Sequence, residues 1–166
     1  MRGEDLKAAQ APLKARYREE PDAATVTLSA SGRLAEGVTC RVQTGQAMAQ
    51  AGLHPASGGD GRSLCSGDML LEALVACAGV TLNAVATSMG IELRDADIHA
   101  EGTLDFRGTL GVDRTVPVGF KSIALSFALD TDADNDQIAT LLKLTERYCV
   151  VLQTISQPPS LSVRRA

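Results

Sequence analysis

Alternation of apolar and polar residues marks the strands of this chain. ATVTLSASG (residues 24–32) and GVTCRVQTG (residues 37–45) each place apolar side chains at every second position, as half-buried strands do. The GRLAEG between them has the composition of a hairpin connection, so Arg33 is expected there. DIHAEGTLDFRGTLG (97–111), FKSIALSFALD (120–130) and SLSVRR (160–165) predict three more strands.

Two longer stretches predict helices. Residues 66–89 are apolar nearly all round and rich in Ala and Gly, which is typical of a buried helix that another backbone can approach. Residues 132–155 place apolar side chains at helical spacing, and Pro158 and Pro159 end this second helix. The order of strands, helix, strands, helix and strand predicts an α+β fold.

Length, charge and composition restrict the class of protein. The 166 residues suit a single domain, 1–166, whose residues 1–22 form an N-terminal arm or short helix. A net charge of −4 and an aromatic share of 3% argue against nucleic-acid binding. We expect no apolar run long enough to span a membrane and see no secretory segment, so a cytoplasmic protein with reduced thiols is predicted.

The candidate chemistry lies in the four cysteines. Cys77 and Cys149 each fall inside one of the two predicted helices, where they either fill the core or form a redox pair. Glu146 lies within a turn of Cys149, and charges at that distance can tune a thiol pKa. Cys65 precedes the first helix, where a structural role or that of an auxiliary thiol is open. Core filling is predicted for Cys40.

The spacing of potential ligands predicts neither a metal site nor a cofactor. There is no C-x-x-C pair, and His54 and His99 fall in a loop and in a strand. SGGDG (57–61) lacks the Lys-Ser/Thr of a phosphate-binding loop, so we interpret it as a plain loop.

Two segments resemble the signatures of the OsmC/Ohr family. SGDMLLEALVACAGVTLNAVA (66–86) is similar to the helix that carries the family's reactive cysteine, and TERYCVVLQTIS (145–156) is similar to the segment of the partner cysteine. The loop GLHPASGGDG (52–61) resembles the OsmC-like branch. The resemblance implies two long central helices wrapped by antiparallel β-sheets in an intertwined homodimer.

The resemblance also implies an activity. Active family members are thiol peroxidases that reduce organic hydroperoxides, with a dithiol reductant that is often a lipoylated protein. Carried over, Cys77 is the peroxidatic and Cys149 the resolving cysteine, joined in a disulfide after oxidation. No cofactor or metal is implied. The alternative is a non-enzymatic redox sensor or small-molecule binding protein of the same family, active in oxidative or osmotic stress.

Two further residues resemble family positions, and position 150 departs from the family pattern. Arg33 resembles the arginine that holds the thiolate, and Asp68 stands at the position of an assisting glutamate, one methylene shorter. Nine residues separate Asp68 from Cys77, which places them on roughly opposite faces of a straight helix. Val150 replaces the proline that usually follows the second cysteine.

Overall fold

The computed structural model describes residues 3–35, 39–42, 51–62 and 64–165. The chain divides into two compact units built from interleaved segments. Unit 1 contains Met1–Ser31, Gln43–Glu72 and His99–Ser126, and unit 2 contains Gly32–Val42, Ala73–Ile98 and Phe127–Ala166. Helices and an antiparallel sheet confirm the predicted α+β class.

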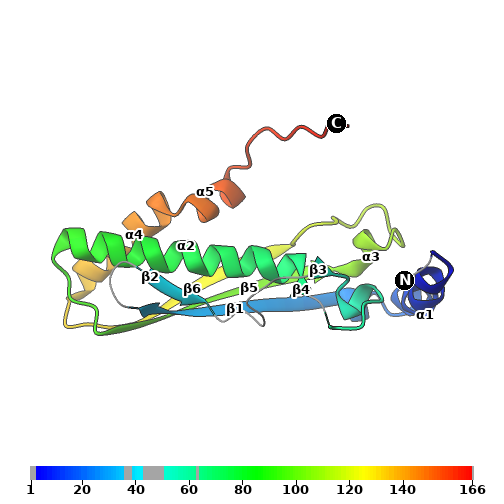
Figure 1. Ribbon diagram of the computed structural model, residues 1–166, viewed down its shortest axis with the longest axis horizontal. Helices are drawn as coiled ribbons and strands as arrows, with labels where there is room; N and C mark the ends of the chain where they lie inside the picture. The colour runs from blue at the N-terminus through cyan, green and yellow to red at the C-terminus, as the bar shows by residue number, and fades with distance from the viewer. Residues whose placement is uncertain (1–2, 36–38, 43–50, 63, 166) are drawn as a thin grey trace. The chain divides into compact units, whose positions relative to one another are not determined.

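Four strands form the main sheet in the order β2-β1-β5-β6 (Figure 1). They are β1 (Thr25–Ala35), β2 (Thr39–Val42), β5 (Asp95–Asp105) and β6 (Ser122–Asp130). β1 and β2 are antiparallel, with Gly32 opposite Val42 and Ala35 opposite Thr39. The predicted hairpin connection was therefore wrong in its first half, because the pairing with β2 extends β1 through Arg33 to Ala35. A short parallel pair, β3 (Ala51–Gly52) and β4 (Leu64–Cys65), forms the second sheet.

The N-terminal segment of unit 1 is the helix α1 (Gly3–Glu19), which includes Pro12. Its Tyr17 is buried, and the phenol donates a hydrogen bond of 2.7 Å to the carbonyl of Ala56. Ala56 lies in the short 3₁₀ helix η2 (Pro55–Ser57), which follows β3. The other short helices of this unit are η1 (Pro21–Ala24) and α3 (Phe106–Thr109). The last turn of α1 is thus bonded to η2.

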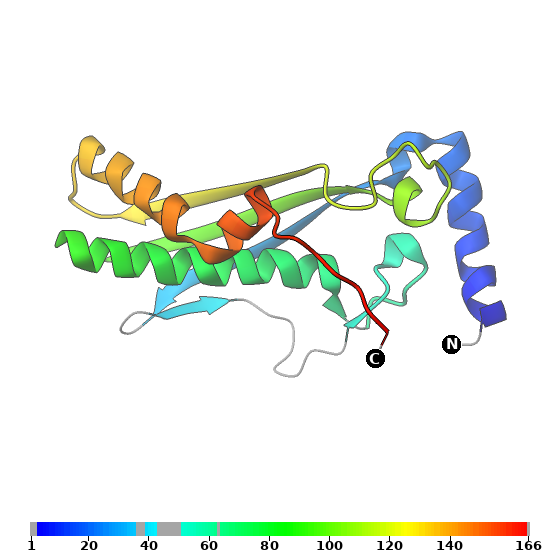
Figure 2. The same ribbon diagram turned by 90° about the horizontal axis from the view of Figure 1, so that it is seen from above.

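The helix α2 spans Ser66–Met89, as the apolar stretch predicted. Its part in unit 2 buries Leu74, Val75, Ala78, Leu82 and Ala86 completely or almost completely. The other helices of unit 2 are α4 (Asn135–Tyr148) and α5 (Val150–Ser156). Both lie beside α2 in the two views (Figures 1 and 2). The core of unit 2 is therefore aliphatic, in keeping with the scarcity of aromatic residues.

The prediction that no apolar run is long enough to span a membrane needs correction for α2. The helix is long and apolar enough to cross a membrane by those two criteria, with a mean hydropathy of 1.8. Its only acidic residues, Asp68 and Glu72, lie near its start, which is why the rest of the helix meets the criteria. Because one face packs into the protein core, we interpret α2 as the core helix of a globular fold.

The second predicted helix and the last predicted strand also differ from the structure. Two helices, α4 and α5, replace the single helix predicted over residues 132–155, and the chain changes direction between them at Cys149 (Figure 2). Residues 157–165 form no helix or strand, so the strand predicted for SLSVRR was wrong. A strand needs a neighbouring strand to accept its hydrogen bonds, and no other described segment pairs with these residues.

Candidate active site

Cys149 lies at the junction of α4 and α5. It is the C-cap residue of α4 and the N-cap residue of α5. Its extended backbone (φ −70°, ψ 103°) interrupts the helix. Its N–H donates to the carbonyl of Thr145, and its carbonyl accepts from the N–H of Gln153, each over 2.9 Å. The thiol therefore projects from a bend that both helices hold in place, and not from the middle of a helix as predicted.

The residues around the bend favour this geometry. Asp134 and Gln137 form a reciprocal capping box that starts α4, and the strongly amphipathic helix then buries Leu141 and Thr145 completely. The Thr145 hydroxyl has no water to bond with, and it donates over 2.9 Å to the carbonyl of Leu141. Thr145 lies one turn before Cys149, so the last turn of α4 is anchored in the core where the chain bends.

Cys77 is one of the groups that act on the Cys149 thiol. The pKa of Cys149 is raised to about 11, and the largest cause is the burial of its inaccessible side chain. A side-chain hydrogen bond and the charge interaction with Cys77 also raise this pKa, whereas the backbone N–H groups of Leu152 and Val151 lower it. Both cysteines are free thiols in unit 2. The two predicted partners thus belong to the same unit, and Cys77 influences the pKa of Cys149.

Cys77 lies near the centre of α2, between its buried and exposed faces. Leu74 and Ala78, on either side in sequence, are buried, whereas Ala73 and Val80 are exposed. Cys77 itself is partly exposed. A small molecule can therefore approach Cys77 more easily than the inaccessible Cys149.

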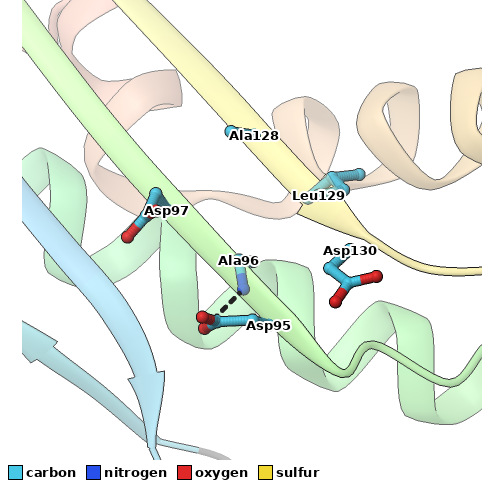
Figure 3. A pocket seen from close by; sticks show the side chains of 6 residues that line it. All are labelled: Asp95, Ala96, Asp97, Ala128, Leu129 and Asp130. Atoms are coloured by element: carbon cyan, nitrogen blue, oxygen red, sulfur yellow. Dashed lines mark hydrogen bonds between the residues drawn. The ribbon is translucent and has the colours of Figure 1, made fainter.

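Arg33 is bound by carboxylates. Its guanidinium lies 2.6 Å from Asp95 and 3.0 Å from Asp97, both on β5, and about two thirds of its side chain is exposed. Figure 3 shows Asp95 and Asp97 beside a hollow of about 240 Å³ that reaches β6 at Ala128, Leu129 and Asp130. The contacts that place Arg33 are therefore ion pairs along the sheet, and a role at a thiolate requires it to leave them.

Asp68 and His54 belong to unit 1. Asp68 lies in the first turn of α2, and partial burial raises its pKa, while the charge of His54 acts in the opposite direction. The His54 ring stacks on Phe106 with 5.0 Å between centroids, and its Nδ1 accepts a 3.0 Å hydrogen bond from Ala56 N–H. When His54 is neutral, the ring proton is therefore on Nε2. The pair forms a small polar group at the start of α2.

Comparison with known proteins identifies the family. A family model described as OsmC-like protein matches residues 59–164. This chain belongs to the OsmC-like protein family. No curated protein matches the chain.

Solved structures of OsmC-like proteins share the fold of this chain. An OsmC-like hydroperoxide resistance protein from Jannaschia sp. CCS1 superposes with a TM-score of 0.63 at 14% identity, covering 86% of this chain and 94% of that chain. An OsmC-like protein from Mycoplasma pneumoniae superposes with a TM-score of 0.56 at 16% identity, covering 81% of this chain and 86% of that chain. These superpositions confirm the predicted fold of the single chain, and the family model confirms the predicted family.

Two further predicted residues of this OsmC-like protein are placed by the structure. Cys65 lies on β4 opposite Gly52 of β3 and is partly exposed, in unit 1. Glu146 is exposed in the last turn of α4, and the influences that shift the pKa of Cys149 do not include its carboxylate. Its backbone carbonyl accepts a 2.9 Å hydrogen bond from the side chain of Gln153. Cys40 lies on β2, and its side chain is outside the described residues.

Gln153 is the residue that sequence reasoning missed in this OsmC-like protein. It occupies a polar position on the predicted second helix, and only the bend at Cys149 brings its side chain to Glu146. Among the described residues, no cluster of three or more His, Cys, Asp or Glu side chains is arranged to hold a metal ion. The site is therefore characterised by two interacting thiols, one on α2 and one at the α4–α5 junction.

Proposed function

We propose that this OsmC-like protein is a thiol-dependent peroxidase that reduces organic hydroperoxides. The observation that carries the proposal is that Cys77 acts on the Cys149 thiol through a side-chain hydrogen bond and a charge interaction. A pair of neighbouring free cysteines can cycle between dithiol and disulfide without a metal or cofactor. The similar Jannaschia structure is that of a hydroperoxide resistance protein, which supports the choice of substrate class.

The proposed reaction has three stages: oxidation of Cys77, disulfide formation with Cys149, and reduction by a dithiol. The Cys77 thiolate attacks the terminal hydroxyl oxygen of the hydroperoxide, the O–O bond breaks, and the leaving alkoxide takes a proton to become an alcohol. The sulfur is thereby oxidised to a sulfenic acid, and the peroxide is reduced. The Cys149 sulfur then attacks the Cys77 sulfur, which releases water and forms the disulfide. A dithiol reductant restores both thiols by two successive exchange steps, and the resemblance implies a lipoylated protein for this role.

Exposure supports this division of roles between the two cysteines. Cys77 is partly exposed, so a hydroperoxide can reach it from solvent. Cys149 is fully buried, and its raised pKa keeps it protonated near neutral pH. A buried and protonated thiol suits a resolving cysteine, because it is protected from peroxide and reacts only with its neighbour. Assistance by Arg33 and Asp68 stays a prediction.

The test is turnover of cumene hydroperoxide with excess dihydrolipoamide as the dithiol. We expect Cys77→Ser to abolish turnover, because the attacking sulfur is lost. Cys149→Ser should stop at a Cys77 sulfenic acid that dimedone traps. Cys65→Ser is the matched control, since it removes a partly exposed thiol of unit 1, and it should keep parental turnover. Parental turnover in Cys77→Ser would refute the proposal.

The same reagents separate the peroxidase from the redox sensor. A sensor would form the Cys77–Cys149 disulfide once under mild peroxide and would not turn over repeatedly with the dithiol. Mass spectrometry of alkylated peptides detects the disulfide, and the ratio of alcohol produced to protein present measures turnover. More than one alcohol per protein supports the peroxidase, and a limit of one supports the sensor.

We further propose that the protein is a homodimer that pairs through α2. In the part of α2 that follows Cys77, the exposed residues Val80, Ala84 and Thr87 follow one another at intervals of four and three residues. This is the spacing of helices that pack along a seam, and the small residues permit close approach. Val80→Glu should yield a monomer in light scattering, whereas Ala139→Glu, at an exposed position of α4, should not. A dimeric Val80→Glu protein would refute this interface.

A further inference from the structure

The bend at Cys149 competes with a straight helix. In a continuous helix, the carbonyl of Glu146 would accept the N–H of Val150, four residues on. The ψ of Cys149, 103°, is far from the helical value of about −42° and prevents that continuation. The bend therefore leaves carbonyls of the last turn of α4 in need of other donors.

Gln153 supplies one of those donors. Its side-chain Nε2 donates over 2.9 Å to the Glu146 carbonyl, seven residues earlier in the chain. Only the amide nitrogen of Gln can donate to a carbonyl, so the orientation of the amide is defined. The Gln153 backbone N–H also donates to the Cys149 carbonyl. One residue of α5 is thus bonded to α4 through its side chain and to the bend itself through its backbone.

Because the residue after Cys149 is Val150, the bend depends on the hydrogen bond from Gln153 Nε2 to the Glu146 carbonyl, which we call the clasp. A proline at position 150 would enforce the bend, because it has no N–H for Glu146 and disfavours helical geometry in the preceding residue. Val150 has an N–H and imposes neither restriction. The hydrogen bond from Gln153 occupies the acceptor that Val150 would use in the straight form, and so favours the bend.

We propose that Gln153 is a positioning residue that holds the Cys149 thiol beside Cys77 by fixing the α4–α5 bend through the Glu146 carbonyl. This inference rests on the proposed function, in which Cys149 closes the disulfide. Loss of the clasp lets the junction straighten, which moves the Cys149 sulfur away from Cys77 and out of its buried position. Peroxide attack at Cys77, on α2, does not depend on the clasp.

The first measurement follows disulfide closure in a single turnover with cumene hydroperoxide, by rapid quench, alkylation and mass spectrometry. Gln153→Met keeps the side-chain length and removes the donor, and closure should slow about three- to tenfold, the range expected for one such hydrogen bond. Sulfenic acid formation, measured in a Cys149→Ser background, should be unchanged. Gln157→Met, one turn further along, is the matched control and should leave closure at the parental rate.

Two rescue variants distinguish positioning from general damage. Gln153→Lys restores an N–H donor of similar reach, and adding Val150→Pro to Gln153→Met enforces the bend without the clasp. Both should return closure to within about twofold of the parent. Closure at the parental rate in Gln153→Met, equal slowing of both chemical steps, or failure of both rescues would overturn the proposal.

A second measurement is independent of peroxide chemistry. In a Cys77→Ser background, iodoacetamide should alkylate Cys149 at least about threefold faster in Gln153→Met, because the thiol leaves its buried position. Gln157→Met should not change this rate. If the parent protein forms no Cys77–Cys149 disulfide with hydroperoxide, the proposed function fails while alkylation still tests the clasp. Unchanged alkylation in Gln153→Met overturns the clasp alone.

Discussion

The raised pKa of Cys149 predicts a steep pH dependence of disulfide closure. The thiolate is the attacking form, so the closure rate follows the fraction of Cys149 that is ionised. With a pKa of about 11, that fraction rises about 90-fold between pH 8 and pH 10. With the ordinary value of 9.0, it would rise only about tenfold over the same interval.

The structure also predicts the absolute effect of the shift. At pH 8 the higher pKa reduces the thiolate fraction about 90-fold relative to an ordinary thiol. A more basic thiolate is a better nucleophile, and a thiol pKa higher by about two units recovers about eightfold of the closure rate. Closure at pH 8 should therefore be about tenfold slower than closure by an exposed cysteine in the same position. Burial is the main cause of the shift, so the effect persists when Cys77 is oxidised.

The assay is a rapid-quench experiment with saturating cumene hydroperoxide, so that the first step is not limiting. Samples are quenched in acid and alkylated, and the Cys77–Cys149 peptide is quantified from pH 8 to pH 10. Sulfenic acid formation in Cys149→Ser, followed over the same range, serves as the control for the first step. A closure rate that rises tenfold or less, or that levels off near pH 9, would refute the assigned environment of Cys149.

Three further predictions concern stability. The folded state holds the Cys149 proton more tightly than the unfolded state, so the stability that this thiol contributes is present below pH 9. About 3 kcal/mol of stability is lost as the pH rises through 11. Urea unfolding of Cys149→Ala should lack that decline, and an identical decline would contradict the raised pKa. Leu82→Ala should cost about 2–5 kcal/mol because the side chain is completely buried, whereas Ser88→Ala, at an exposed position of the same helix, should cost less than about 1 kcal/mol; equal losses would contradict the orientation of α2. Tyr17→Phe should cost about 1 kcal/mol through the lost bond to Ala56, and unchanged thermal unfolding would contradict the docking of α1.

Local sequence predicted those parts of the fold that depend on local physics. The stretch from Ser66 to Met89 contains good helix formers and no internal proline, so its limits could be predicted. The clean alternation of Ile123, Leu125, Phe127 and Leu129 likewise predicted β6. Features that depend on distant partners were missed. Arg33 was placed in a turn because its strand conformation depends on pairing with β2, and the strand predicted at 160–165 has no described neighbour.

By itself, the sequence determined that two cysteines lie on two helix-forming segments with the signatures of the OsmC-like family, because helical periodicity and motif spacing are properties of consecutive residues. Only the tertiary structure decided that the second segment bends at Cys149, that Gln153 bonds across the bend, and that the two thiols interact. The physical reason is that burial and hydrogen bonding between helices determine both the backbone path at Cys149 and the pKa of its thiol. Neither quantity is encoded in the residues next to Cys149, since Val150 permits a straight helix as readily as a bent one.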